Sequence, residues 1–332
     1  MKKRNLIFVA MLFVALSFGF SACENPDDNE ELLNRIEQLE NQLKDQQSGK
    51  DDDKTDSADK DGDKDTSSDN EQNGDGTPDP DEGEGGSSDD SNSNLVPAAF
   101  SVSSTQQVYF SPGNLQYHPA DDEWRFAENQ TDYIGDANSN ISSTYNGWID
   151  LFGWGTGANP TNSSTDYNDY QTFVDWGTNQ IGADVPNTWR TLTYDEWYYL
   201  RYERPNYDEL IGVAQVNGVN GLILLPDAWI CPEGITFKSG FHSNYGVDYY
   251  AAYQTFTADQ WSKMEQAGAV FLPAAGLRYG SDVRYVQGSG GFWSATGSGS
   301  YGAYGLGFYS DVADVGSRYR NYGLSVRFVK DL

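Results

Sequence analysis

A long polar stretch divides this chain into a part that can bury a core and a part that cannot. Residues 48–94 consist almost wholly of Asp, Glu, Lys, Ser, Gly, Asn and Pro. They hold too few apolar side chains for a core, so we expect a disordered, self-repelling and therefore extended acidic linker. Residues 95–332 are rich in Trp, Tyr and Phe, and no second linker-like stretch interrupts them. We expect one folded domain there.

The N-terminus has the pattern of a lipoprotein signal. Three basic residues precede an apolar run, Leu6–Phe20, which is too short to span a bilayer comfortably and fits a signal peptide. The segment Phe20–Cys23 resembles the lipobox of bacterial lipoproteins, which are cut before the cysteine and acylated on it. We therefore expect a signal peptide over residues 1–22 and a lipid anchor on Cys23 that holds the chain to a membrane. The alternative is an ordinary signal peptide with an incidental cysteine.

Acidic residues follow Cys23 closely and bear on the destination of the chain. They lie at Asp27, Asp28, Glu30 and Glu31 and resemble the export signal of Bacteroidetes surface lipoproteins. This likeness implies an outer-membrane lipoprotein that is exposed on the cell surface.

The segment 29–47 has Leu and Ile alternately four and three residues apart, which is typical of a coiled coil. Two heptads are marginal for an isolated helix in water. Weak self-association through this segment and a single frayed helix beside the membrane both remain open.

Charge and cysteine content limit what the folded domain can do. The chain carries −29, of which residues 1–23 contribute +3 and residues 24–94 contribute −19, which leaves −13 for residues 95–332. An acidic domain is a poor partner for phosphate backbones, so we expect no nucleic acid ligand. With Cys23 acylated, Cys231 has no intrachain partner, and we expect it to be a small packed residue.

Strand and helix patterns alternate along residues 95–332 and predict an α+β fold. Two helices begin with capping-box patterns, at Thr193–Glu196 and Thr257–Gln260, and are expected over Tyr194–Arg204 and Ala258–Ala267. The clearest expected strands are Phe100–Phe110, Gly221–Pro226, Ala269–Ala274 and Leu324–Val329.

Several motifs in a fixed order resemble a paralogous family of Bacteroidetes and Fibrobacter surface lipoproteins. The motifs are Ser111–Tyr117, Trp124–Ala127, Gly147–Thr156, Trp189–Thr193, Gly221–Pro226, Met264–Gly276, Trp293–Thr296 and Ser325–Val329. The resemblance covers essentially all of residues 100–330. It implies a C-type lectin-like fold of the formylglycine-generating, sulfatase-modifying subtype. Variable proteins of diversity-generating retroelements use the same fold to display hypervariable residues on a rigid frame.

The residues that catalysis or metal binding would need are missing or isolated. Formylglycine-generating chemistry needs a cysteine pair, and Cys231 is alone. The carboxylates of Asp121–Glu123 and Asp195–Glu196 fit a solvated loop and a helix cap better than a glycosidase pair. His118 and His242 have no zinc-like spacing and are expected on the surface or in loops. We therefore expect a protein that is not an enzyme and holds no metal or cofactor.

The region of about 278–329 differs in composition and is the candidate display region. Tyr, Ser, Gly and Asp dominate it, and antibody-like binding surfaces use Tyr, Ser, Gly and Asn because rigid rings give contact area at low entropic cost. The same set is what randomising the adenines of Asn codons would produce. Ordinary aromatic-rich hairpins with some tyrosines in the core are the alternative. The buried frame is expected at Phe292, Trp293, Leu306, Phe308, Val326 and Phe328. The ligand-binding residues, expected together on one exposed face, are Tyr279, Asp282, Tyr285, Tyr301, Tyr304, Tyr309, Asp311, Asp314, Tyr319, Asn321 and Tyr322.

These patterns predict a surface-displayed lipoprotein whose lectin-like domain binds a protein or glycan ligand, with diversification by a retroelement as an added hypothesis. Two alternatives stay open: a degenerate relative of sulfatase-modifying or glycan-processing enzymes, and a structural adhesion component of the envelope.

Overall fold

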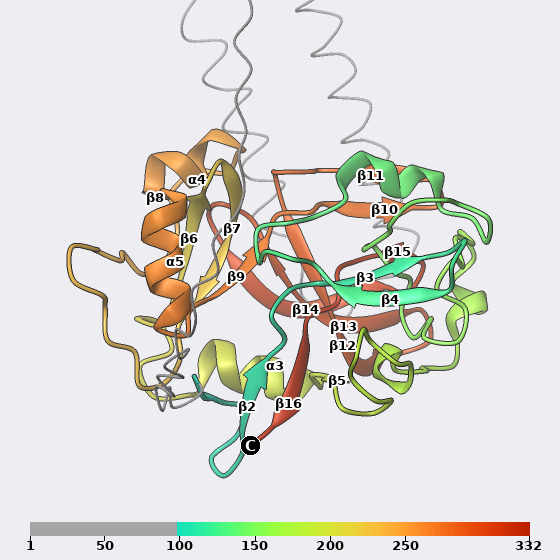
Figure 1. The fold of residues 1–332 in the computed structure, drawn as a ribbon, viewed down its shortest axis with the longest axis horizontal. Helices are drawn as coiled ribbons and strands as arrows, with labels where there is room; N and C mark the ends of the chain where they lie inside the picture. The colour runs from blue at the N-terminus through green and yellow to red at the C-terminus, as the bar shows by residue number, and fades with distance from the viewer. Residues whose placement is uncertain (1–97) are drawn as a thin grey trace, which may run out of the picture. The chain divides into compact units, whose positions relative to one another are not determined.

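The computed structural model describes residues 98–332 (Figure 1). The expected signal peptide, the Cys23 anchor, the coiled-coil segment 29–47 and the linker 48–94 lie outside these residues. Short strands outnumber helices in the described part, which makes the domain α+β or mainly β.

The two ends of the described chain meet in one antiparallel sheet. β2 and β16 lie side by side, with Phe110 opposite Val329 (Figure 1). The strand order is β1-β2-β16-β5, with β1 at Phe100–Ser101, β2 at Gln107–Phe110, β16 at Phe328–Asp331 and β5 at Arg190–Thr191. The chain therefore closes on itself, and its C-terminal strand is covered on both edges.

Two helices, α4 and α5, lie beside the strands of a second sheet (Figure 1). Its order is β8-β6-β7-β9, with β6 at Ile211–Val216, β7 at Val219–Leu224, β8 at Thr255–Phe256 and β9 at Val270–Pro273. α4 spans Asp248–Tyr253 and α5 spans Ala258–Gln266. The strands β6, β7 and β9 are almost wholly buried because both faces of this sheet are covered.

The C-terminal third forms two three-stranded sheets. In the larger sheet, β12 (Gly290–Ser298), β13 (Gly302–Phe308) and β14 (Ala313–Tyr319) are antiparallel neighbours. In the smaller sheet the order is β11-β10-β15, with β10 at Leu277–Tyr279, β11 at Asp282–Arg284 and β15 at Tyr322–Gly323. A hairpin of β3 (Leu115–His118) and β4 (Glu123–Phe126) and three 3-10 helices, Gly135–Asn140, Tyr167–Tyr170 and Trp176–Thr178, complete the fold.

The expected frame of the display region is confirmed. Phe292, Trp293, Leu306, Phe308, Val326 and Phe328 are all at most 1% exposed. Phe292, Leu306 and Phe308 pack with Trp197 of α3 (Tyr194–Tyr202), and Trp293 packs with Trp154 and Trp176 in a neighbouring cluster. The C-terminal sheet is therefore anchored on two sides by large apolar side chains.

Both expected helices form where the capping boxes place them. The hydroxyls of Thr193 and Thr257 accept the backbone N–H groups of Glu196 and Gln260, whose side chains return the bond. α3 ends at Tyr202, two residues before the expected Arg204, because the N–H groups of Glu203 and Arg204 both bond to the carbonyl of Tyr199. α5 ends one residue early, and α4 is a helix that the sequence analysis missed.

Two expected strands differ from the structure. The run Phe100–Phe110 is a hairpin and not one strand, because the Ser103 hydroxyl accepts the N–H groups of Thr105 and Gln106 and turns the chain. The strand expected at Leu324–Val329 begins only at Phe328. Leu324 and Ser325 instead bridge singly to Phe152 and Phe292, so this segment crosses the core between sheets.

The environments expected for two residues are wrong. Cys231 is exposed, in a loop where Ile230 is also 82% exposed. His118 is buried on β3, with its ring 5.1 Å from the Trp148 ring and its Nδ1 3.1 Å from Asp121 Oδ2. The strand pattern around His118 places it inside, which its isolation in the sequence did not indicate.

Candidate ligand-binding surface

The β12–β14 sheet presents two unlike faces. Side chains alternate along β13, so Leu306 and Phe308 enter the core while Gly305 and Gly307 face the other way. A Cβ on Gly307 would lie 2.4 Å from the Arg318 guanidinium, which shows that Arg318 of β14 lies across the glycine backbone. Its Nη2 donates to Asp314 Oδ1 at 2.8 Å. Gly307 and Gly316, where an added Cβ would meet Arg318 or Asp314, leave room for this ion pair on the sheet.

The smaller sheet brings two of its tyrosines next to a third, at the end of β14. Tyr279 of β10 pairs with Tyr322 of β15, with ring centroids 5.9 Å apart, and the Tyr322 ring is 5.5 Å from that of Tyr319. Asp282 stands opposite Tyr279 on β11 and accepts from Arg284 Nε at 2.6 Å. Edge-to-face contacts of this kind hold rings in fixed positions.

Buried hydrogen bonds from Arg278 hold the smaller sheet in place. It is fully buried, and its guanidinium donates to the carbonyls of Leu151, Asn162 and Gly280, with the two bonds to Leu151 at 3.2 and 3.1 Å. Burial lowers the pKa of Arg278 to about 10. The composition marked Arg278 only as the start of the display region, whereas in the structure it positions the neighbouring Tyr279.

Tyr285 occupies a strained turn between the two sheets. Its φ is 59°, in the left-handed region that bulky residues rarely adopt, and it is 41% exposed. Its carbonyl accepts the N–H groups of Gly288 at 2.8 Å and Ser289 at 3.0 Å. Gln287, at φ 64°, is tied to Asn220 and Tyr133. These hydrogen bonds therefore hold the turn in place, and they keep a tyrosine at a backbone conformation that glycine would adopt without strain.

The turn between β13 and β14 is also fixed. Ser310 is fully buried; its hydroxyl donates to the carbonyl of Asn244 at 3.0 Å and accepts the N–H of Gly246 at 2.9 Å. Its carbonyl accepts the N–H of His242 at 2.8 Å. On either side of Ser310 stand Tyr309, whose ring is 5.2 Å from that of Tyr245, and the half-buried Asp311.

Electrostatic coupling joins these groups. Burial, followed by the nearby Tyr319, Tyr279 and Tyr285, raises the pKa of Tyr322 to about 12. Burial also raises the pKa of Tyr309; Arg318 opposes the rise, while Tyr285 and Asp314 add to it. The charge of Tyr285 acts on both Tyr322 and Tyr309, whose groups lie near opposite ends of β14. We call the combined set the tyrosine surface: Tyr279, Asp282, Tyr285, Tyr309, Asp311, Asp314, Tyr319 and Tyr322.

Three expected ligand-binding residues lie apart from the tyrosine surface. Tyr304 packs on Tyr194 of α3, with ring centroids 4.2 Å apart, and Tyr301 packs on Tyr167 at 4.3 Å. The expected exposure of Asn321 is wrong. It is 5% exposed and donates to the carbonyl of Thr165 at 2.5 Å, because the turn between β14 and β15 packs against that loop.

Tyr304 instead extends a row of tyrosines along α3. The rings of Tyr194 and Tyr198 are 5.7 Å apart, and those of Tyr198 and Tyr202 are 4.9 Å apart, as the four-residue spacing on one helix face requires. The sequence analysis did not assign a role to these helix residues.

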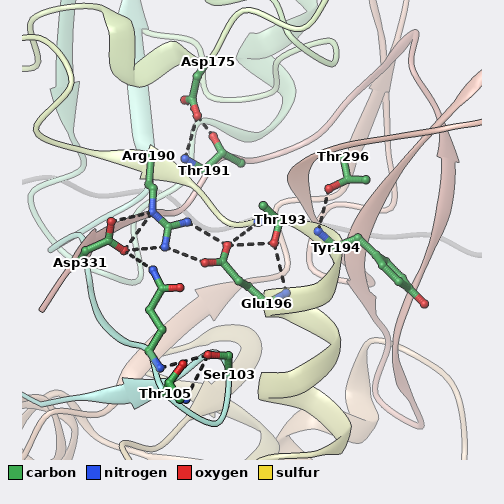
Figure 2. A network of polar contacts seen from close by, with 11 residues as sticks. Ser103, Thr105, Asp175, Arg190, Thr191, Thr193, Tyr194, Glu196, Thr296 and Asp331 are labelled. Carbon is green, nitrogen blue, oxygen red and sulfur yellow. Dashed lines mark hydrogen bonds and ion pairs between the residues drawn. The ribbon is translucent and has the colours of Figure 1, made fainter.

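The carboxylates considered for catalysis have structural roles. Figure 2 shows Arg190 between Asp331 and Glu196, with Nη2 2.6 Å from Asp331 Oδ1 and 2.7 Å from Glu196 Oε1. Glu196 also closes the α3 cap through Thr193, as expected from the sequence. The Tyr194 N–H donates to Thr296 Oγ1 at 3.0 Å, which ties α3 to β12. The other candidates, Asp121–Glu123, are exposed in the β3–β4 turn.

An open depression of about 680 Å³ lies against Gln116 of β3 and the 3-10 helix Gly135–Asn140. Arg125, Asp132, Asp136 and Val286 contribute to its lining. Within residues 98–332, no group of three or more His, Cys, Asp or Glu side chains is arranged to hold a metal ion. The helices of that part of the chain are all too short or too polar to cross a membrane.

Comparison with known proteins gives one match. A family model described as a domain of unknown function, DUF8237, matches residues 252–329. No curated protein and no solved structure matches the chain. The span similar to DUF8237 runs from the end of α4 into β16 and contains every residue of the tyrosine surface.

Proposed function

We propose that this chain is a surface-displayed lipoprotein whose folded domain binds a protein or glycan ligand through the tyrosine surface. The observation that carries the proposal is the group of three tyrosine rings, Tyr279, Tyr319 and Tyr322, on backbone that buried residues hold rigid. Tyr279, Tyr285, Tyr309, Tyr319 and Tyr322 are half-buried or exposed, while the frame beneath them is at most 1% exposed. Rigid aromatic rings that project from a fixed frame lose little entropy on binding.

The fold that we propose for the domain is C-type lectin-like. The motifs that resemble the Bacteroidetes and Fibrobacter family supply core residues in all parts of the domain, among them Trp124, Trp293 and Phe328. Motifs in a fixed order that all contribute buried core residues support a shared fold. An experimental structure of the domain with a different strand order from known C-type lectin-like domains would reject this part of the proposal.

The lipid anchor can be tested separately from binding. Metabolic labelling with a radioactive fatty acid should label the wild-type chain and fail to label Cys23→Ser. Protease added to intact cells should remove the folded domain if it faces outward. Labelling of Cys23→Ser at the wild-type level would refute the anchor and leave the binding proposal untouched.

Binding is tested by presenting the purified chain to arrays of glycans and of bacterial and host surface proteins. A true ligand should lose at least tenfold in affinity with Tyr279→Ala plus Tyr322→Ala, because both rings would leave the surface together. The matched control is Tyr207→Ala, which removes a tyrosine that is 36% exposed outside the tyrosine surface. A ligand that both variants bind as well as wild type would locate the site elsewhere.

Diversification is the last part of the proposal. A reverse-transcriptase gene beside the coding sequence, with a repeat of the 3′ end that differs at adenines, would support it. Absence of both from the neighbouring DNA would leave a binder of fixed sequence.

A further inference from the structure

One carboxylate of the tyrosine surface lacks a cation, whereas its two neighbours have one. Asp282 pairs with Arg284 and Asp314 pairs with Arg318, at 2.6 and 2.8 Å. Asp311 makes no ion pair within residues 98–332, and it is half-buried. Burial raises the pKa of Asp311, because a partly desolvated carboxylate without a counter-ion is disfavoured in its charged form.

The position of Asp311 is fixed by its neighbours. Ser310 anchors the turn to the loop of Asn244 and Gly246 through three hydrogen bonds, so the turn cannot move freely to expose the carboxylate to water. Asp311 stands two residues after Tyr309 in the turn that the Tyr309 N–H closes on the Val312 carbonyl at 2.8 Å, and the Tyr309 ring is 5.2 Å from the Tyr245 ring. A carboxylate beside two aromatic rings offers a cation both an ion pair and a cation–π contact.

The charge of the domain favours the same ligand chemistry. Residues 95–332 carry −13, so the surrounding potential attracts cations and repels acidic polymers such as sulfated glycans. Tyr, Trp and Arg dominate the energetics of protein–protein interfaces, and the tyrosine surface already has Arg284 and Arg318 at its edges. A protein that presents a basic side chain fits this surface better than a neutral or acidic sugar does.

We propose that the ligand is a protein and that Asp311, beside the rings of Tyr245 and Tyr309, binds a lysine or arginine side chain of that protein. This inference rests on the proposed binding function and specifies its partner. The bound cation compensates the one unpaired carboxylate of the tyrosine surface, and Asp311 sets specificity for it.

The test starts from a random peptide display library selected on the purified, immobilised chain. Peptides enriched in Lys or Arg are the expected result, and Asp311→Asn should weaken the best of them at least tenfold. Asp208→Asn is the matched control, because Asp208 is an exposed carboxylate on the turn after α3. Changing the basic residue of the peptide to Met should cost a similar factor in wild type and little in Asp311→Asn.

The outcomes separate this inference from the function on which it rests. Selected peptides without basic residues, or an Asp311→Asn variant that binds as wild type, would overturn the inference. If those peptides still depend on Tyr279 and Tyr322, the proposed function survives. Preferential binding of glucosamine oligomers or neutral glycans, or a selection that yields no peptide, also overturns the inference. Equal melting temperatures of the two Asn variants and wild type exclude misfolding as the cause of a loss.

Discussion

Two sets of tyrosines in this domain, one buried and one at the surface, have different roles. Tyr117, Tyr170 and Tyr250 are buried, and each donates its hydroxyl within the protein, to Asp122, to Ser164 and to Gly288. The rings of the tyrosine surface contact one another instead, as Tyr279 and Tyr319 contact Tyr322. Hydroxyls that donate inside the fold stabilise it, whereas rings that lie at the surface can contact a ligand.

The largest expected effect comes from removing a buried tyrosine. Tyr250 is fully buried on α4, so Tyr250→Ala should lower the free energy of unfolding by about 3–5 kcal/mol, as for other large-to-small changes of aromatic core residues. Tyr279→Ala, at a side chain that is 37% exposed, should cost about 1 kcal/mol because it loses mainly one ring contact. Urea unfolding of both variants measures the difference. Similar losses would show that Tyr279 belongs to the structural frame.

The buried carboxylate of Asp150 should make the free energy of unfolding depend on pH. Asp150 is fully buried and accepts from Ile134 N–H and Asn138 Nδ2, yet burial raises its pKa to about 6 from the ordinary 3.8. The folded state therefore holds this proton to higher pH than the unfolded state does. Stability from this group is fully present below pH 4 and falls by about 3 kcal/mol as pH rises to about 6.

Asp150→Asn should remove that slope, because the amide does not titrate. Urea midpoints of the variant and wild type between pH 4 and 7 provide the measurement, with the exposed Asp208→Asn as control. A wild-type stability that rises over this range, while Asp150→Asn stays flat, would contradict the expected direction.

Much of the frame could be predicted from the sequence, because it depends on local signals. The capping boxes at Thr193 and Thr257 and the buried positions of β12 and β13 follow from spacing and alternation. Strand limits could not be predicted where the partner is distant in sequence. Ser325, for example, bridges to Phe292, and no local pattern indicates that contact.

The candidate surface could be predicted only in part. Composition pointed to the region in which the tyrosine surface lies, but it does not separate a tyrosine that packs on α3, such as Tyr304, from one on the tyrosine surface, such as Tyr322. It also gave no sign that Asn321 would be buried by Thr165 or that Tyr245 would join Tyr309. These contacts join residues far apart in the sequence, and only the folded chain brings them together.

Removing only the hydroxyl oxygen, by a Tyr→Phe change, should distinguish a buried tyrosine from one of the tyrosine surface. Tyr250→Phe leaves the buried carbonyl of Gly288 without its donor at 3.1 Å and should cost about 1–3 kcal/mol. Tyr309→Phe removes a hydroxyl for which the described residues provide no hydrogen bond, so it should change stability by less than about 0.5 kcal/mol. Thermal unfolding of both variants compares them directly. A large loss for Tyr309→Phe would assign that hydroxyl to the frame.

A small change in stability is also expected at the strained Tyr285. Glycine adopts its φ of 59° without a steric cost, so Tyr285→Gly should relieve strain and roughly offset the lost ring, within about 1 kcal/mol of wild type. Binding should fall because the ring that joins the two halves of the tyrosine surface is gone. Tyr285→Phe keeps the ring and should bind as wild type unless the hydroxyl itself contacts the ligand. A Tyr285→Gly variant that is both stable and fully active in binding would show that the strain at this turn serves the fold and not the ligand.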